Sequence, residues 1–149
     1  MIGRTLGGAT IATFQGTIVL FISLIAGFRP ISWSFVPFAI LIMFLTSLLF
    51  TAMGTAIASK LDDMQGFQII INFLVMPLFF LSGAIFPLSG TGVLGIIARF
   101  DPLSYSVDAL RHLLSGINYF SLGIDITVLT LITLAFLGLG SYFFSKVQI

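Results

Sequence analysis

The residues that could do chemistry are few, and most of them fall in one segment near position 110. His112 follows Asp108 by four positions and Ser106 by six, a set that suggests nucleophilic catalysis at first sight. A serine–histidine–acid triad needs mutual hydrogen-bond reach, which a six-residue separation on one helix does not give. The chain has no cysteine, and it contains no phosphate-binding loop, H-E-x-x-H or G-x-S-x-G motif. We therefore predict that it is not an enzyme and that it uses no metal or cofactor.

A second group of polar residues is better suited to contacting a polar cargo than to catalysing a reaction. Gln68 and Asn72 stand four positions apart in an apolar stretch, so they share one face of a helix. Amides inside a membrane are costly unless they are paired or face a water-filled cavity. Thr51 and Thr55 form a similar row in the preceding stretch. All four are candidates for a translocation path, although hydroxyl rows also serve plain helix packing, which the residues alone favour for the threonines.

Small residues recur at helical spacing near the start of the chain. Gly8, Ala12 and Gly16 are each four positions apart, so they form one narrow stripe along a helix. Such stripes let helix backbones approach closely in lipid. We expect this stripe to lie at a helix–helix contact.

The composition excludes a water-soluble domain. The chain has 149 residues, of which 58% are hydrophobic and only 7% are charged, with a formal net charge of +1. Soluble domains carry roughly 25% charged residues, so a fold of this length could not cover its surface. The small net charge gives no reason to expect nucleic-acid binding. The elements that position the candidate residues must therefore be membrane helices.

Four long apolar stretches could form these membrane helices, at residues 6–28, 33–58, 67–86 and 124–144. Each approaches or exceeds the roughly 20 residues that cross a bilayer as a helix. The first has a longer apolar core than the 7–15 residues of a signal peptide, so we interpret it as a span. Arginine and lysine are balanced between the two sides, and the positive-inside rule leaves the orientation open.

The segment between the last two stretches is too polar to cross and too apolar for an ordinary loop. Asp101 and Pro102 predict a helix start, with aspartate at the cap and proline in the first turn. Gly116 predicts its end. The helix is about 14 residues long and reaches some 21 Å, which is too short to span.

This short helix has two predicted faces. One is an apolar row at helical spacing: Leu103, Val107, Leu110 and Leu114. The other carries Asp108, Arg111 and His112. Asp108 can pair with either base, and we expect Arg111 to bond Asp108 or backbone carbonyls at the end of the first short helix. Residues 90–116 are therefore either a re-entrant hairpin that enters one leaflet or an amphipathic helix that lies on the surface. Both interpretations stay open on the residues alone.

Two motifs carry a family resemblance. The stretch FLSGAIFPLSG (Phe80–Gly90), followed by FDPLSYSVDALRHLLSG (Phe100–Gly116), closely resembles the permease subunits of type-two ATP-binding-cassette exporters of bacteria and archaea. Pro102, Leu103, Tyr105 and Arg111 look like that family's signature, and the terminal FSKVQI is similar to its usual ending. One departure is Thr91-Gly92, where the family often has Leu-Pro.

The resemblance implies a fold and a function for the whole chain. It implies an all-α integral membrane protein with four transmembrane helices and a short external hairpin, in which Asp101, Pro102, Tyr105, Asp108 and Arg111 build a gate. Residues 1–149 then look like one transmembrane domain, the last four spans of a six-span permease with cytoplasmic termini. The expected partners are a separate ATP-binding subunit, a second permease copy and membrane lipids, in the plasma membrane of a bacterium or archaeon.

The expected function is export of a drug, lipid-like or saccharide cargo. Two alternatives remain at this point: a non-transporting membrane subunit or anchor, and a small channel or secondary transporter. The last usually needs ionisable residues inside its spans or helices broken at mid-depth.

Overall fold

The computed structural model describes residues 2–61, 63–85 and 93–147, and every regular element in these ranges is a helix. This confirms the all-helical fold class. In chain order the elements are α1 (Ile2–Ile25), the 3-10 turn η1 (Trp33–Phe35), α2 (Val36–Ala58), α3 (Met64–Leu81), α4 (Val93–Ala98), α5 (Pro102–Ser115) and α6 (Leu122–Val147).

Four of these helices are long and apolar enough to cross a membrane: Ile2–Ile25, Trp33–Ala58, Met64–Leu81 and Leu122–Phe143. They match the four predicted stretches in number and order. The third ends before the predicted residue 86 because Ser82 caps α3 and Gly83 takes a left-handed φ of 74°, which stops the helix. Large apolar side chains on these helices are exposed, including Phe14 at 67% and Phe73 at 82%. In a bilayer, lipid covers these apolar side chains, so they are not exposed to water.

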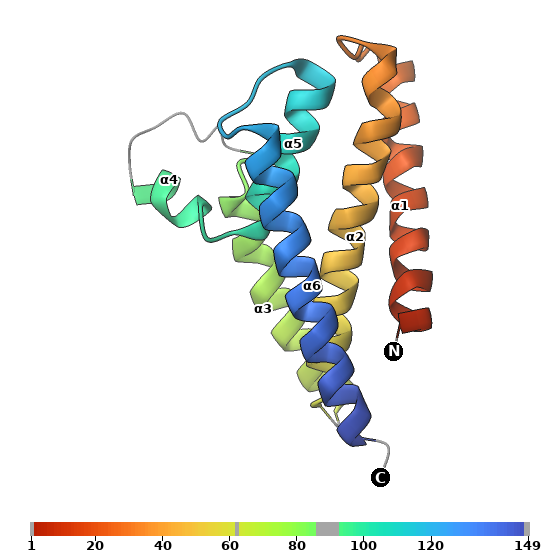
Figure 1. Cartoon of the computed structure of the whole chain (residues 1–149), viewed down its shortest axis with the longest axis vertical. Coiled ribbons are helices and arrows are strands. Elements are labelled where there is room, and N and C mark those ends of the chain that lie inside the picture. Colours follow the sequence, from red (N-terminus) through yellow and green to blue (C-terminus); the bar gives the residue numbers. More distant parts are fainter. Residues whose placement is uncertain (1, 62, 86–92, 148–149) are drawn as a thin grey trace.

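The bundle is built around α2 (Figure 1). Helix α1 packs along one side of α2, and α5 and α6 pack along another. Both chain termini lie at one end, which we call the terminal end, and α5 lies at the opposite, hairpin end (Figure 1). Helix α3 makes few contacts with any neighbour, and none of its residues is buried. Helices α1, α2, α5 and α6 therefore form one packed unit, with α3 beside it.

The core lies where α2, α5 and α6 meet. Its buried members are Ala39, Ile42, Leu49, Tyr105, Ala109, Leu113 and Leu129. The small residues Ala39 and Ala109 are 0% exposed, so they set how closely the helices approach. This core places α5 firmly within the bundle.

The small-residue stripe faces α2. A methyl group added at Gly8 would lie 2.7 Å from Cγ2 of Thr51, and one at Gly16 would lie 3.5 Å from Sδ of Met43. Ala12, between them, is half-buried. At Gly8 a side chain could fit only if Thr51 moved, so the absence of a side chain there allows the close approach of α1 and α2.

Candidate functional site

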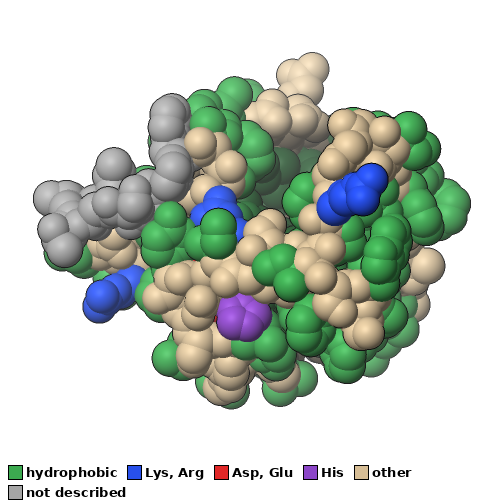
Figure 2. All heavy atoms as spheres, turned by 90° about the horizontal axis from the view of Figure 1, so that it is seen from above, with side chains coloured by type: hydrophobic (Ala, Val, Ile, Leu, Met, Phe, Trp, Pro, Cys, Tyr) green, Lys and Arg blue, Asp and Glu red, His purple; other side chains and the backbone are tan. Residues whose placement is uncertain are grey.

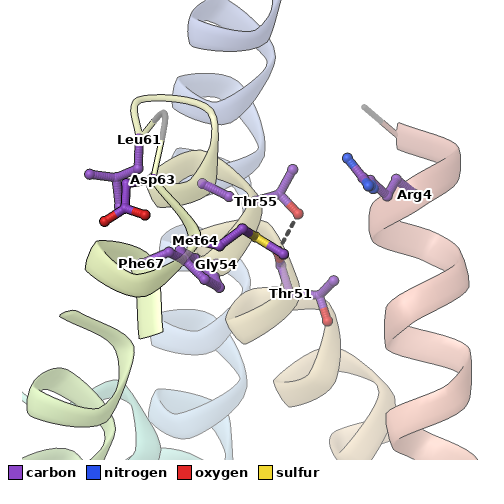
Figure 3. Close-up of a pocket in the computed structure, with 9 residues that line it drawn as sticks. Arg4, Thr51, Gly54, Thr55, Leu61, Asp63, Met64 and Phe67 are labelled. Atoms are coloured by element: carbon purple, nitrogen blue, oxygen red, sulfur yellow. Dashed lines mark hydrogen bonds between the residues drawn. The ribbon is translucent and has the colours of Figure 1, made fainter. Parts of the chain in front are cut away.

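A pocket of about 530 Å³ opens between α1, α2 and the start of α3, at the terminal end of the bundle. Figure 3 shows Arg4 reaching toward it from α1, while Asp63 stands on the opposite side at the α2–α3 turn. The lining combines polar and apolar side chains: Arg4, Thr51, Gly54, Thr55, Ala58, Leu61, Asp63, Met64 and Phe67. The pocket is therefore amphipathic, with a cation and a carboxylate on opposite walls.

Local sequence explains how the pocket walls are held. The carboxylate of Asp63 accepts hydrogen bonds from the backbone amides of Gln65, at 3.1 Å, and Gly66, at 3.0 Å, and so caps α3. The hydroxyl of Thr55 donates to the carbonyl of Thr51 at 2.7 Å (Figure 3). A hydroxyl that donates to its own helix keeps its lone pairs free to accept a bond from a cargo. The wall thus offers acceptors on α2.

The four residues predicted for a translocation path fall into two places. Thr51 and Thr55 line the pocket, whereas Gln68 and Asn72 are exposed on α3 outside its lining. The Gln68 amide donates to the Asn72 side-chain oxygen at 3.2 Å. Each amide therefore satisfies part of the other's hydrogen-bonding capacity on a mostly apolar helix.

The hairpin helix starts and ends as predicted. Asp101 accepts a hydrogen bond from the Leu103 amide at 2.8 Å, Pro102 occupies the first turn, and Gly116 ends α5 with a φ of 71°. Burial raises the pKa of Asp101 to about 6, since the Leu103 bond offsets only part of the loss of water. Residues 86–92, which include the start of the predicted hairpin and the motif residues Phe86 and Pro87, lie outside the described residues.

The most buried face of α5 is not the predicted apolar row, although Leu110 and Leu114 of that row pack against the core. The buried face carries Tyr105, Ala109 and Leu113 together with Ser104, Ser106 and Asp108. The predicted row of Leu103, Val107, Leu110 and Leu114 is only half-buried. The reason is that α5 packs against both α2 and α6, so its buried face must be wide, and polar side chains enter it where they meet backbone groups.

Of the two kinds of partner expected for Arg111, the structure shows a backbone carbonyl and not Asp108. Asp108 is 1% exposed, and its carboxylate accepts hydrogen bonds from the backbone amides of Tyr119, at 2.8 and 3.1 Å, and of Phe120, at 2.7 Å. It therefore fastens the loop between α5 and α6 to α5. Because both carboxylate oxygens meet backbone amides, this clamp fixes the entry to α6.

Arg111 turns in a different direction from Asp108. Its Nη2 donates to the carbonyl of Gly83 at 2.8 Å, and its guanidinium lies 5.7 Å from the centroid of the Tyr119 ring. The Ser104 hydroxyl reaches the carbonyl of Leu81 at 3.3 Å. Both acceptors belong to the end of α3, where carbonyls have no intrahelical partner. Helix α5 is thereby tied to α3.

Tyr105 joins the two halves of the hairpin. Its hydroxyl donates to the carbonyl of Arg99, just after α4, at 2.7 Å. Its ring stacks on Phe120 at 5.1 Å between centroids. The side chain therefore links α4, α5 and the loop that leads to α6.

Sequence reasoning missed one residue, Asp125. It stands in the first turn of α6, inside the fourth apolar stretch, and is 0% exposed with both carboxylate oxygens unpartnered among the described residues. The signal was present: a carboxylate within a membrane span is by default a candidate functional residue.

The surface at the hairpin end is basic. Seen from that end (Figure 2), Lys or Arg and His side chains are visible and no acidic side chain is. The three carboxylates of this part of the chain, Asp101, Asp108 and Asp125, are at most 2% exposed. Burial of the acids, rather than an excess of bases, leaves this face positive.

Comparison with known proteins assigns the family. The family described as ABC-2 type transporter matches residues 1–115, which include the pocket and most of the hairpin. The chain belongs to the ABC-2 type transporter family. This ABC-2 chain is therefore a multi-pass membrane protein of a transport family, as its four apolar helices indicate.

The ABC-2 chain also has named relatives. Nodulation protein J of Rhizobium leguminosarum bv. trifolii is 30% identical over 120 residues, which cover 78% of this chain and 44% of the relative. Nodulation protein J of Rhizobium meliloti (strain 1021) is 25% identical over 130 residues, 87% of this chain and 49% of the relative. The chain thus spans about half the length of these curated relatives. No solved structure matches it.

Proposed function

We propose that this chain forms part of the permease of an ABC-type exporter and that the pocket at its terminal end is the inner mouth of the translocation path. The family match over residues 1–115 carries the proposal. The pocket supports it, because Arg4 and Asp63 stand beside apolar side chains such as Met64 and Phe67. Such a wall suits an amphipathic cargo, which agrees with a drug, lipid-like or saccharide substrate.

The proposal also covers the orientation of the chain in the membrane and its partners. The termini and the pocket face the cytoplasm of a bacterium or archaeon, and the hairpin faces outward. A separate ATP-binding subunit supplies the energy. A second permease copy covers α3, whose exposed Gln68–Asn72 pair is supported in lipid only if protein or water faces it. Residues 1–149 are then the last four spans of a six-span permease.

Transport in inverted membrane vesicles tests the pocket. The permease is produced together with its ATP-binding subunit, and ATP-dependent uptake is measured with a panel of amphipathic probes. We expect Thr55→Leu to reduce uptake by about tenfold or more, because a bulkier apolar side chain fills the pocket and removes an acceptor; a loss of tenfold corresponds to about 1.4 kcal/mol. Arg4→Ala should change which probes are taken up, favouring neutral ones.

The matched control is Thr10→Leu. Thr10 makes the same kind of bond to its own helix, to the Leu6 carbonyl at 2.8 Å, but is exposed on α1 outside the pocket lining. Its substitution should leave uptake unchanged. Equal uptake by the Thr55→Leu, Arg4→Ala and Thr10→Leu proteins would remove the pocket from the path, and ATP-independent uptake would favour a channel or secondary transporter.

A further inference from the structure

The core between α2, α5 and α6 contains a carboxyl group that the rest of the described chain leaves without a partner. Asp125 is 0% exposed, and among the described residues neither of its carboxylate oxygens has a hydrogen-bond partner. It lies one turn before Leu129 on α6, a residue of the apolar core. An ionised carboxylate in such surroundings is expensive unless a positive charge meets it. A negative charge on Asp125 would therefore need a positive charge beside it.

A second carboxylate lies beside it. Asp108 is close enough to Asp125 for the two groups to interact electrostatically. The described hydrogen bonds to Asp108 come from the Tyr119 and Phe120 amides, so these donors serve Asp108 and not Asp125. Two neighbouring buried carboxylates resist being ionised together. Asp125 is therefore the member of the pair that no described donor compensates.

The elements packed around Asp125 do not supply that charge within the described chain. Helix α2 has no titratable residue. On α5, Tyr105 is near enough to interact but donates its hydroxyl to a backbone carbonyl, and Arg111 donates to another. The Nδ1 atom of His112 has no described partner, and Arg99 is exposed. None of the described contacts joins a cationic side chain to Asp125.

We propose that Asp125, with Asp108 beside it, is a binding site for a small monovalent cation, either a proton or an alkali-metal ion. One positive charge at Asp125 removes the repulsion between the carboxyl groups and lets the first turn of α6 pack against α5. Loss of the cation drives the two helices apart at the same loop that Asp108 holds through Tyr119 and Phe120. The site therefore controls the joint between the hairpin and the last span, away from the pocket at the other end.

Thermal unfolding of the protein in lipid nanodiscs tests this site. The midpoint temperature is measured across pH at fixed sodium and across sodium at fixed pH, for wild type and for Asp125→Asn. We expect the wild type to lose several degrees when protons or sodium are withdrawn, and Asp125→Asn to lose less. Asp101 titrates in both proteins, so their difference isolates Asp125. Asp63→Asn, an exposed cap at which asparagine also serves, is the control and should behave as wild type.

Infrared spectroscopy of wild type and Asp125→Asn identifies the cation. A protonated-carboxyl band from isotope-labelled aspartate that is present in the wild type at neutral pH, missing from Asp125→Asn and insensitive to sodium assigns a proton. Sodium-dependent stability without that band assigns an alkali-metal ion. The proposal would be overturned by three results together in the wild type. These are no such band, an unfolding midpoint that does not change with sodium, and a pH dependence of that midpoint equal to that of Asp125→Asn. These measurements need no cargo and no ATP-binding subunit, so their outcome is independent of the export proposal.

Discussion

At the scale of single residues, the hairpin is held by side chains that bond backbone groups rather than one another. Asp108 accepts from the amides of the following loop, Arg111 donates to Gly83, and Tyr105 donates to Arg99. Each partner is a backbone group outside a helix or at its end, where the helix itself cannot satisfy it. Satisfying those groups is what allows irregular chain to lie against a membrane bundle.

Arg111 gives the sharpest prediction at this scale. Arg111→Ala leaves the Gly83 carbonyl without its donor, so we expect a loss of about 1–3 kcal/mol in stability and lost export with normal membrane insertion. Arg99→Ala is the control, because the Arg99 side chain is exposed and only its backbone carbonyl is used. Fluorescence-detected size exclusion and vesicle uptake measure the two effects.

Cysteine labelling distinguishes an Arg111 bonded to Gly83 from an Arg111 on a helix that lies on the membrane surface. A cysteine at position 111 should react slowly with a membrane-impermeant reagent, whereas one at position 99 should react quickly. Rapid labelling at 111, together with wild-type export by Arg111→Ala, would show that the arginine only projects into water.

At the scale of elements, sequence predicted the helices better than their contacts. The spans, the Asp101-Pro102 start and the Gly116 end follow from composition, capping and backbone preference, which are local. The face of α5 and the partner of Asp108 could not be predicted, because they depend on Tyr119 and Phe120, whose amides come close only after the chain turns. Asp125 was visible in the sequence, but its lack of a partner is a property of three packed helices.

The contact between α1 and α2 gives a prediction with a matched control. Gly8→Leu must displace Thr51, so we expect about 1–3 kcal/mol of destabilisation from overpacking. Gly16→Leu should cost less, since Met43 is flexible and a methyl group there meets only ordinary contact. A methyl group added at Gly7 would meet no atom within 4 Å, so Gly7→Leu should be neutral or stabilising, since leucine favours helix over glycine by about 1 kcal/mol.

Thermal unfolding of the three variants in one detergent measures this order. The α1–α2 contact would not depend on the stripe if Gly8→Leu and Gly7→Leu unfolded at the same temperature. Insertion into the membrane should be normal for all three, because leucine is at least as apolar as glycine.

At the scale of the whole molecule, helix α3 makes few contacts with the rest of the bundle. Helix α3 has no buried residue, and it is joined to the rest by the Ser104 and Arg111 bonds at one end. At the other end Lys60, just before α3, lies 4.0 Å from the centroid of the Phe143 ring on α6. The exposed length of α3 is the surface that the proposed second permease copy would cover.

The topology of the molecule can be tested directly. Four crossings place the α2–α3 turn and the start of α6 on opposite sides, so reporter fusions at Lys60 and at Ser121 should give opposite signals, with Lys60 cytoplasmic. The reporters are a phosphatase that is active only outside and a fluorescent protein that is active only inside. Identical signals at both positions would contradict the four-span arrangement, and reversed signals would place the hairpin in the cytoplasm.

The clamp made by Asp108 also sets the order in which the molecule can be assembled. Chains emerge from the ribosome N-terminus first, and the donors for this carboxylate, Tyr119 and Phe120, are made 11 and 12 residues after it. The bond from Arg111 to Gly83 joins two residues that have both been made by then. During synthesis the hairpin can thus be tethered to α3 before it is locked, so released chains truncated before position 119 should remain open to proteases that the full 149-residue chain resists.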